Sequence, residues 1–202
     1  MASNDISRVD ARRFMSRPPR AYRQLSQNEK AMVAEWEPRQ GAKALVHRRG
    51  FLLYYDFPLV YVALIFVERA HRSKGIATAL LSKCSVPCMA TVLDNRLWER
   101  LGWEIHEVAP DRVTVAVRGL TTPEHRDMFD MEVMRMALYS KLPMRVHDRM
   151  VSDQEFATTF QERLARSVRV MMDMRKSLVA SGMPSQLALR TVLDSCLDEA
   201  NQ

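Results

Sequence analysis

The stretch that decides the fold is LVYVALIFVERAHRSKGIA, residues 59–77. Its first nine residues are apolar, β-branched or aromatic, which is typical of a strand covered on both faces. The polar residues that follow predict a turn, with Gly75 where the backbone must approach a ligand closely. After the turn, Ile76, Ala79 and Leu80 recur at helical spacing and predict a helix. Backbone N–H groups at the start of a helix, beside Arg69, Arg72 and Lys74, predict a site that attracts phosphate.

Two short motifs in this region resemble landmarks of the GNAT N-acetyltransferases. Residues 72–77, RSKGIA, resemble the family's acetyl coenzyme A signature, R/Q-x-x-G-x-G/A. Residues 94–103, DNRLWERLGW, resemble the helix and strand start that form its second landmark. The resemblance covers about residues 26–120. It implies an α+β fold, a GNAT-like mostly antiparallel twisted sheet with flanking helices, and acetyl coenzyme A (acetyl-CoA) as cofactor, without a metal.

The resemblance also implies which residues would form the site. Those that would contact the coenzyme are Val67, Arg69, Arg72, Ser73, Lys74, Gly75, Ile76, Ala77 and Asn95. Many family members use a Tyr to protonate the leaving thiolate, but Trp98 stands at that position and its indole N–H is too weak an acid. Many also use a Glu on the strand as the base, and Glu68 is the nearest carboxylate here. His71 could accept a proton too, although a His in a basic turn is more often a polar loop residue.

Two functions therefore remain open. The first is an N-acetyltransferase that binds acetyl-CoA and lets an amine attack the thioester directly. The second is a catalytically inactive GNAT-fold scaffold, or a structural subunit of a larger assembly such as a virus particle. The basic turn favours the first function. The second is favoured by Trp98, by the lack of a carboxylate between Leu59 and Val67, and by the short helix between Gly75 and Cys84.

Composition bounds the class of protein. The chain has 202 residues, 47% hydrophobic and 27% charged, which suits one core plus an appendage. It contains no run of about 18 apolar residues and no secretory signal, so we expect a cytoplasmic protein, or one in a virus particle, without a membrane partner. Cys84, Cys88 and Cys196 have no zinc-like spacing, so we expect reduced thiols and no metal site.

The net charge of +6 is concentrated at the start of the chain. Residues 1–25 hold six Arg and two Asp, while residues 123–202 have a net charge of −1. With Pro18 and Pro19, these first residues predict an Arg-rich extended arm. The arm is either an anchor on an acidic surface or nucleic acid, or a solubilising tail.

The remaining signals of residues 26–120 predict the other elements of the sheet domain. Ser26, with Glu29 three residues later, forms a capping box for a helix that Pro38 ends. The expected strands, besides residues 59–67, are residues 44–48, 51–57, 88–93, 103–108 and 112–118.

Residues 121–202 predict an all-α extension of about three helices. The first begins at Thr122, the second is capped by Ser152, and the third follows Gly182. The second carries a long apolar stripe, whose members are Phe156, Phe160, Leu164, Val168, Met171, Met174 and Leu178. Its charged residues, typical of a solvated face, include Arg163, Arg166, Arg169, Arg175 and Lys176.

The apolar stripe has two interpretations. The helices could form a small bundle that packs on itself and on the sheet domain. Alternatively, their Met-rich faces could be buried against another chain. We expect self-association or a stable protein partner, with Met171 and Leu178 in the contact and the Arg-rich arm adding electrostatic steering.

Overall fold

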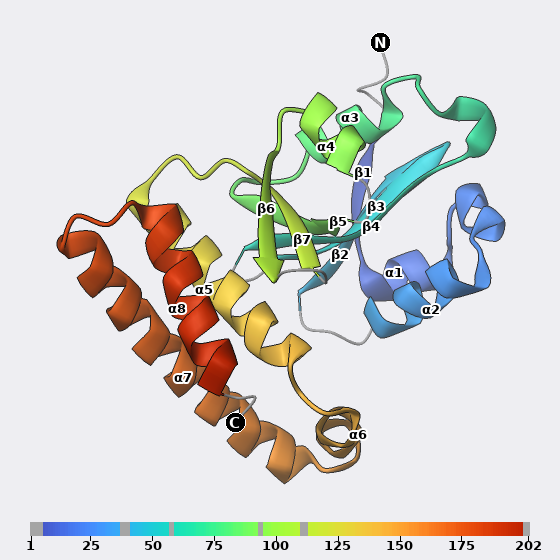
Figure 1. The fold of residues 1–202 in the computed structure, drawn as a ribbon. Helices are drawn as coiled ribbons and strands as arrows, with labels where there is room; N and C mark the ends of the chain where they lie inside the picture. Colours follow the sequence, from blue (N-terminus) through green and yellow to red (C-terminus); the bar gives the residue numbers. More distant parts are fainter. Residues whose placement is uncertain (1–5, 37–40, 57–58, 93–94, 110–112, 200–202) are drawn as a thin grey trace. The chain divides into compact units, whose positions relative to one another are not determined.

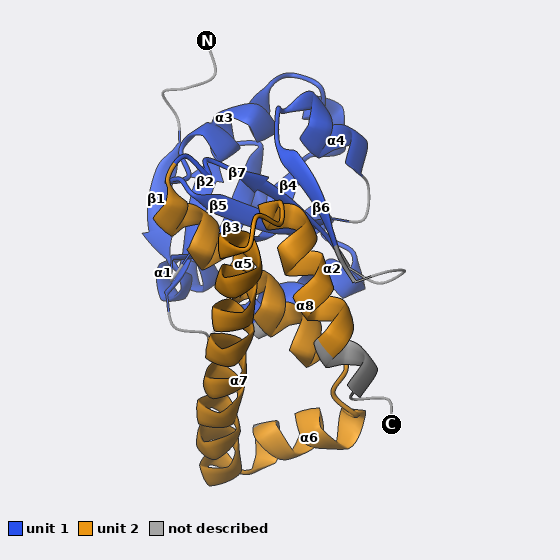
Figure 2. Cartoon of the chain, turned by 60° about the vertical axis from the view of Figure 1, so that its left-hand side comes forward, with its two compact units in different colours: residues 1–107, 113–121 blue, residues 108–112, 122–202 orange. Residues whose placement is uncertain are grey.

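The computed structural model describes residues 6–36, 41–56, 59–92, 95–109 and 113–199. It divides the chain into two compact units (Figures 1 and 2). The first comprises residues 1–107 and 113–121, and the second residues 108–112 and 122–202. None of the helices in the described residues is both long and apolar enough to cross a membrane.

The first unit is built on a seven-stranded sheet with the strand order β1-β2-β3-β4-β5-β7-β6 (Figure 1). Strands β4 and β5 are parallel, and the other pairs with a described register are antiparallel. The predicted α+β fold with a mostly antiparallel sheet is therefore confirmed. The strands are β1 (Ser7–Asp10), β2 (Ala42–His47), β3 (Gly50–Asp56), β4 (Val60–Val67), β5 (Cys88–Val92), β6 (Glu104–Ala109) and β7 (Val113–Arg118).

Helices cover both faces of this sheet. On one face, Leu80 and Leu81 of α3 (Ile76–Ser82) and Trp98 of α4 (Asn95–Arg100) join the buried side chains of the strands. On the other face, Phe51, Leu53 and Phe66 pack against three elements. These are α1 (Ala11–Ser16), the 3₁₀ helix η1 (Arg20–Gln24) and α2 (Gln27–Trp36). The strands alternate between two apolar layers because successive side chains point to opposite faces.

The predicted extended arm at residues 1–25 is wrong over the residues that the structure describes. β1 pairs with β2 from Ser7 opposite Val46 to Asp10 opposite Lys43. Phe14 is 1% exposed, and its ring lies edge-on to Phe51 with 5.2 Å between centroids. The few apolar side chains among the arginines are therefore core residues.

The capping box before α2 is confirmed. Ser26 N–H donates to Glu29 Oε2 at 2.7 Å, and Glu29 N–H donates to Ser26 Oγ at 3.3 Å. The six predicted strands correspond to β2 to β7. Where their ends are described, they begin and end within two residues of the predicted bounds. Pro38, Phe57, Leu93 and Arg112, at which predicted elements end or begin, lie outside the described residues.

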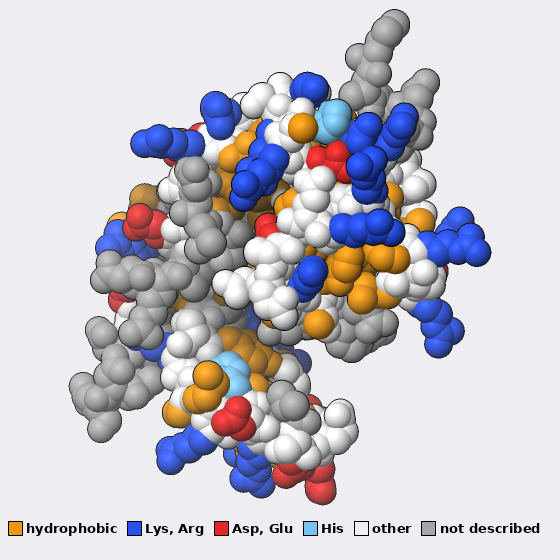
Figure 3. Space-filling model, turned by 90° about the vertical axis from the view of Figure 1, so that its right-hand side faces the viewer, with side chains coloured by type: hydrophobic (Ala, Val, Ile, Leu, Met, Phe, Trp, Pro, Cys, Tyr) orange, Lys and Arg blue, Asp and Glu red, His pale blue; other side chains and the backbone are white. Residues whose placement is uncertain are grey.

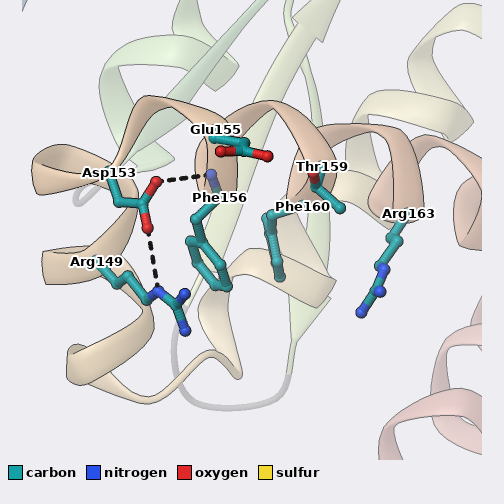
Figure 4. Close-up of a pocket in the computed structure, with 7 residues that line it drawn as sticks. All are labelled: Arg149, Asp153, Glu155, Phe156, Thr159, Phe160 and Arg163. Carbon is teal, nitrogen blue, oxygen red and sulfur yellow. Dashed lines mark hydrogen bonds and ion pairs between the residues drawn. The ribbon is translucent and has the colours of Figure 1, made fainter.

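The second unit has four helices in its described residues, one more than predicted. They are α5 (Pro123–Ser140), α6 (Met144–Ser152), α7 (Gln154–Ala180) and α8 (Ser185–Glu199). The cap of α7 is Asp153, which accepts from Phe156 N–H at 2.9 Å (Figure 4). Ser152 ends α6 instead and donates to Asp148 O. The prediction that Ser152 caps α7 is therefore wrong by one residue, and the short helix before it was missed.

The expectation that Arg175 lies on a solvated face is also wrong. Its side chain is 6% exposed, and its two terminal nitrogens contact carboxylates of α5. Nη1 lies 3.1 Å from Asp127 Oδ1, and Nη2 lies 2.5 Å from Asp130 Oδ2. Nη2 also donates to Ser185 Oγ at 2.7 Å. One buried guanidinium thus links α7 to both α5 and α8.

The apolar stripe of α7 is buried only in part. Leu164, Val168 and Met171 are buried, but Met174 is 42% exposed. Met171 is therefore not available for the contact with another chain that we expected. A groove along α7 and α8 remains, and it is lined by Val170, Asp173, Met174, Ser177, Leu178, Thr191, Val192 and Ser195.

Phe14 is expected to be essential for the stability of the sheet unit. Replacing Phe14 with Ala should lower the free energy of unfolding by about 3–5 kcal/mol, because it empties a fully buried aromatic site. Denaturant unfolding measures this, with Met15→Ala as control, since Met15 is the neighbouring side chain and 37% exposed. Equal effects of the two substitutions would show that residues 11–16 do not pack on the sheet.

Asp130 is expected to make the helical unit less stable as the pH rises. Burial raises the pKa of its carboxyl to about 6 and outweighs the attraction of Arg175. The folded form then binds the proton more tightly than the unfolded chain. This contribution to stability is present below about pH 4 and is lost as the pH rises through about 6.

Asp130→Asn should remove that dependence because the amide does not titrate. The measurement is urea unfolding at pH 4.5 and 7.5, where the wild type should lose about 2 kcal/mol more than the variant. Asp173→Asn, which changes an exposed carboxylate of α7, is the control. A wild type and Asp130→Asn with the same pH dependence would contradict the assignment.

Candidate functional site

The site begins where the parallel strands β4 and β5 separate. β4 pairs with β3 over nearly all its length, from Val60 to Val67. Its pairing with β5 covers only Val60, Tyr61 and Val62. Residues 63–67 therefore have no described sheet partner on the β5 side, so their backbone groups there can bind a ligand.

The chain after β4 forms a tight turn that exposes backbone amides. The 3₁₀ helix η2 (Arg69–His71) is followed by two residues in the left-handed region, Ser73 with φ of 62° and Gly75 with φ of 75°. Gly75 is the N-cap of α3, whose first amides have no acceptor within the helix. A Cβ at Gly75 would have nothing within 4 Å. The turn therefore opens onto free space at the start of the helix.

The predicted contact residues are brought together around this turn. Arg69, Arg72 and Lys74 are exposed, and Arg72 Nε donates to Val67 O at 3.3 Å. The side chain of Ile76 is 6% exposed and lies in the sheet core, so only its backbone can face a ligand. The remaining predicted residues near the turn, Ser73 and Ala77, are exposed and half-buried respectively.

Glu68 is buried at the start of the turn and is held by an ion pair. Its side chain is 5% exposed, and Oε2 lies 3.2 Å from Arg49 Nη1 and 3.8 Å from His71 Nε2. Its N–H also donates to Arg49 O at 3.0 Å. Oε1 accepts no hydrogen bond from the described residues. The predicted base is thus a buried carboxylate that ties the turn to the loop between β2 and β3.

Arg49 is the residue of this site that sequence analysis missed. It comes just before Gly50, where a Cβ would lie 2.6 Å from Phe66 O. Only glycine lets the β2–β3 turn approach β4 this closely, and the approach brings the Arg49 guanidinium to Glu68. The sequence shows the Arg49-Gly50 pair between two predicted strands, but it does not indicate that Glu68 is the partner of Arg49.

The second motif contributes packing rather than an exposed proton donor. Trp98 is 7% exposed, and its ring lies edge-on to Trp103 with centroids 4.7 Å apart. Asn95, the first residue of α4, is exposed. The indole of Trp98 is therefore a core side chain of the sheet unit, which agrees with its unsuitability as an acid.

The thiols of the described residues are poor nucleophiles. Burial raises the pKa of Cys84 to about 12, and it also raises the pKa of Cys88. No group of three or more His, Cys, Asp or Glu side chains in the described ranges could hold a metal ion. The chemical groups at the turn are backbone amides, the guanidinium and ammonium groups of its Arg and Lys side chains, the His71 imidazole and the Glu68 carboxylate.

No family model and no curated protein matches the sequence. The solved structures that resemble this chain include an acetyltransferase from Thermus thermophilus, at 16% identity and a TM-score of 0.39, covering 58% of this chain and 99% of that one. Another is described as a GNAT-family acetyltransferase from Desulfovibrio desulfuricans, at 15% identity and a TM-score of 0.38, covering 57% and 99%.

A third similar structure holds a coenzyme. It is described as a streptothricin acetyltransferase from Bacillus anthracis in complex with acetyl coenzyme A, with 14% identity and a TM-score of 0.32, covering 42% of this chain and 64% of that one. The likeness concerns part of the fold.

Replacing Trp98 separates packing from catalysis. Trp98→Tyr should lower the free energy of unfolding by about 1–3 kcal/mol, because a smaller ring leaves a void beside Trp103. If the protein is an enzyme, its turnover per folded molecule in a coenzyme A release assay should not fall. Trp98→Phe is the matched control, since it removes the same packing but brings no hydroxyl. A large loss of turnover in both variants would give Trp98 a positive role in the reaction.

Proposed function

We propose that this protein binds acetyl coenzyme A at the turn after β4 and transfers the acetyl group to an amine. The observation that carries the proposal is the separation of β4 from β5 beyond Val62, directly before a basic turn with Gly75 in the left-handed conformation. A strand edge without a described sheet partner, followed by exposed amides, suits a ligand that has both an amide-bearing arm and a pyrophosphate.

The residues of the turn fit the pyrophosphate of the coenzyme. Two negative charges would lie beside the amides that begin α3, with Arg69, Arg72 and Lys74 exposed around them. The open space next to Gly75 leaves room for phosphate oxygens to reach the backbone. Asn95 and Ala77 are the remaining candidates for contact.

The chemistry would be acyl transfer without a covalent intermediate on the protein. The bound thioester would supply the acyl group, and those amides of residues 63–67 that face the open edge of β4 would orient it and polarise its carbonyl. The proton that leaves the attacking amine would pass to water or to Glu68, whose Oε1 has no described hydrogen-bond partner. Trp98 cannot return a proton to the thiolate, so water would do so and the reaction would be slow.

A second candidate is a catalytically inactive GNAT-like scaffold within a larger assembly, in the cytoplasm or in a virus particle. The observation that favours it is the burial of Trp98, which leaves the second motif without an exposed acid. The assembly would be a second copy of the chain or a protein partner at the helical unit, where Met174 remains 42% exposed.

Calorimetric titration with acetyl coenzyme A tests the proposed site. Replacing Gly75 with Val should weaken binding at least tenfold, because the side chain would fill the space that the ligand needs and would strain a left-handed residue. Gly182→Val is the matched control: Gly182 has φ of 97° and likewise nothing within 4 Å of its Cβ, but it lies in the other unit.

The outcomes separate the two candidates. Binding by the wild type that is lost in Gly75→Val and kept in Gly182→Val supports the coenzyme site, and release of coenzyme A with an amine present supports transfer. Binding without turnover for any amine tested favours the scaffold. Unchanged affinity in Gly75→Val would remove this turn from consideration.

A further inference from the structure

The segment before α2 presents a group of arginines that the proposed acetyl transfer does not use. We call Arg12, Arg13, Arg17, Arg20 and Arg23 the arginine surface; all five side chains are exposed. Lys and Arg side chains project from the face of the molecule shown in Figure 3. We propose that the arginine surface binds the phosphate backbone of double-stranded nucleic acid.

The charges of the arginine surface are not neutralised within the part of the chain that the structure describes. None of its five side chains forms an ion pair with a described residue. The acidic residue closest to them in sequence is Asp10, and its carboxylate caps α1 by accepting from Arg13 N–H at 2.7 Å. The surface therefore offers positive charge to a partner from outside.

The arginines stand on folded elements rather than on a flexible tail. Ala11 and Phe14 of α1 are buried, which turns Arg12 and Arg13 outward on the remaining part of the helix. In η1, Ala21 is buried at 0% exposure, and a 3₁₀ helix has about three residues per turn, so Arg20 and Arg23 lie on one side. Because the backbone is already ordered, a partner would have to immobilise only side chains.

The composition of the surface favours phosphate over an acidic protein. Specific protein interfaces have an apolar or aromatic centre, whereas the large hydrophobic side chain exposed here is Met15, at 37%. Phosphate-backbone binding needs no such centre. All five cations are Arg, whose planar guanidinium binds phosphate oxygens in a bidentate manner.

The surface favours a duplex over a single strand. Single-strand binding relies on exposed aromatic rings on which bases stack. The aromatic side chains of this segment are turned inward instead: Phe14 is 1% exposed, and Tyr22 is half-buried with its ring edge-on to Phe14, 6.1 Å between centroids. Contacts to the backbone alone carry no base information, so binding should be insensitive to sequence.

The test is fluorescence anisotropy with the full chain and a labelled 20-base-pair duplex at 50 to 200 mM KCl. The variant Arg12→Gln, Arg20→Gln, Arg23→Gln should bind at least tenfold more weakly at 50 mM KCl. Its slope of log affinity against log salt should be less steep by up to about 3, because each lost phosphate contact removes about 0.9. Thermal unfolding verifies that the variant is folded.

The control removes the same charge elsewhere. Arg163→Gln, Arg166→Gln, Arg169→Gln changes three exposed arginines of α7 and lowers the net charge equally. It should keep wild-type affinity and slope. Equal weakening of both variants would mean attraction by net charge alone and would overturn the proposal.

Competition distinguishes the polyanions. Unlabelled duplex of unrelated sequence should displace the probe at much lower concentration of charge than poly-glutamate. Displacement by poly-glutamate at the same concentration, or no duplex binding at 50 mM KCl, would overturn the proposal in favour of an acidic protein partner. Neither result depends on acetyl coenzyme A, so the acetyl-transfer proposal stands or falls separately.

Discussion

The pairing of β4 is the constraint on which the sheet unit depends. This strand is hydrogen-bonded along one side to β3 from Val60 to Val67, but along the other side to β5 only as far as Val62. The long pairing holds β4 in the middle of the sheet, and the short pairing leaves the second half of the strand with one open edge. Within the paired part, the Tyr61 hydroxyl lies 2.6 Å from Thr91 Oγ1 of β5.

The turn after β4 is fixed to this frame by a buried charge. Glu68 is hidden from water, and a lone buried carboxylate is costly, so its Arg49 partner must stay in place. Removing one member of such a pair generally costs about 3–5 kcal/mol because the other charge is left unpaired. The ion pair therefore joins the β2–β3 turn to the basic turn, and the amides before α3 are held open by the same contacts that hold the sheet together.

Local sequence signals predicted the elements that depend on neighbouring residues. They could not predict contacts between residues that are far apart in the sequence. The apolar run of β4, the Ser26 capping box and the Gly75 turn each depend on residues that are close in sequence. The first residues were misjudged because arginine and proline dominate their composition, while buried side chains such as Phe14 determine their packing. Arg175 has the spacing of a surface residue on α7, and only the approach of α5 brings the Asp127 carboxylate to it across 48 positions. The tertiary fold supplies the counter-charge that makes such burial tolerable, so the pattern of one helix cannot reveal it.

The position of Trp98 bears most directly on what this fold does. A side chain that packs against Trp103 in the core stabilises α4 and the start of β6, and it can do so only by facing away from solvent. An acid at the same position would have to reach the leaving group, so packing and proton donation compete for one residue. Here Trp98 packs in the core, while the turn at Gly75 has the open space beside its backbone that the proposed coenzyme binding requires. In the proposed function, coenzyme binding and proton donation to the leaving group would rest on separate parts of the sheet unit, so the proposed coenzyme site does not depend on whether the chemistry is slow or absent.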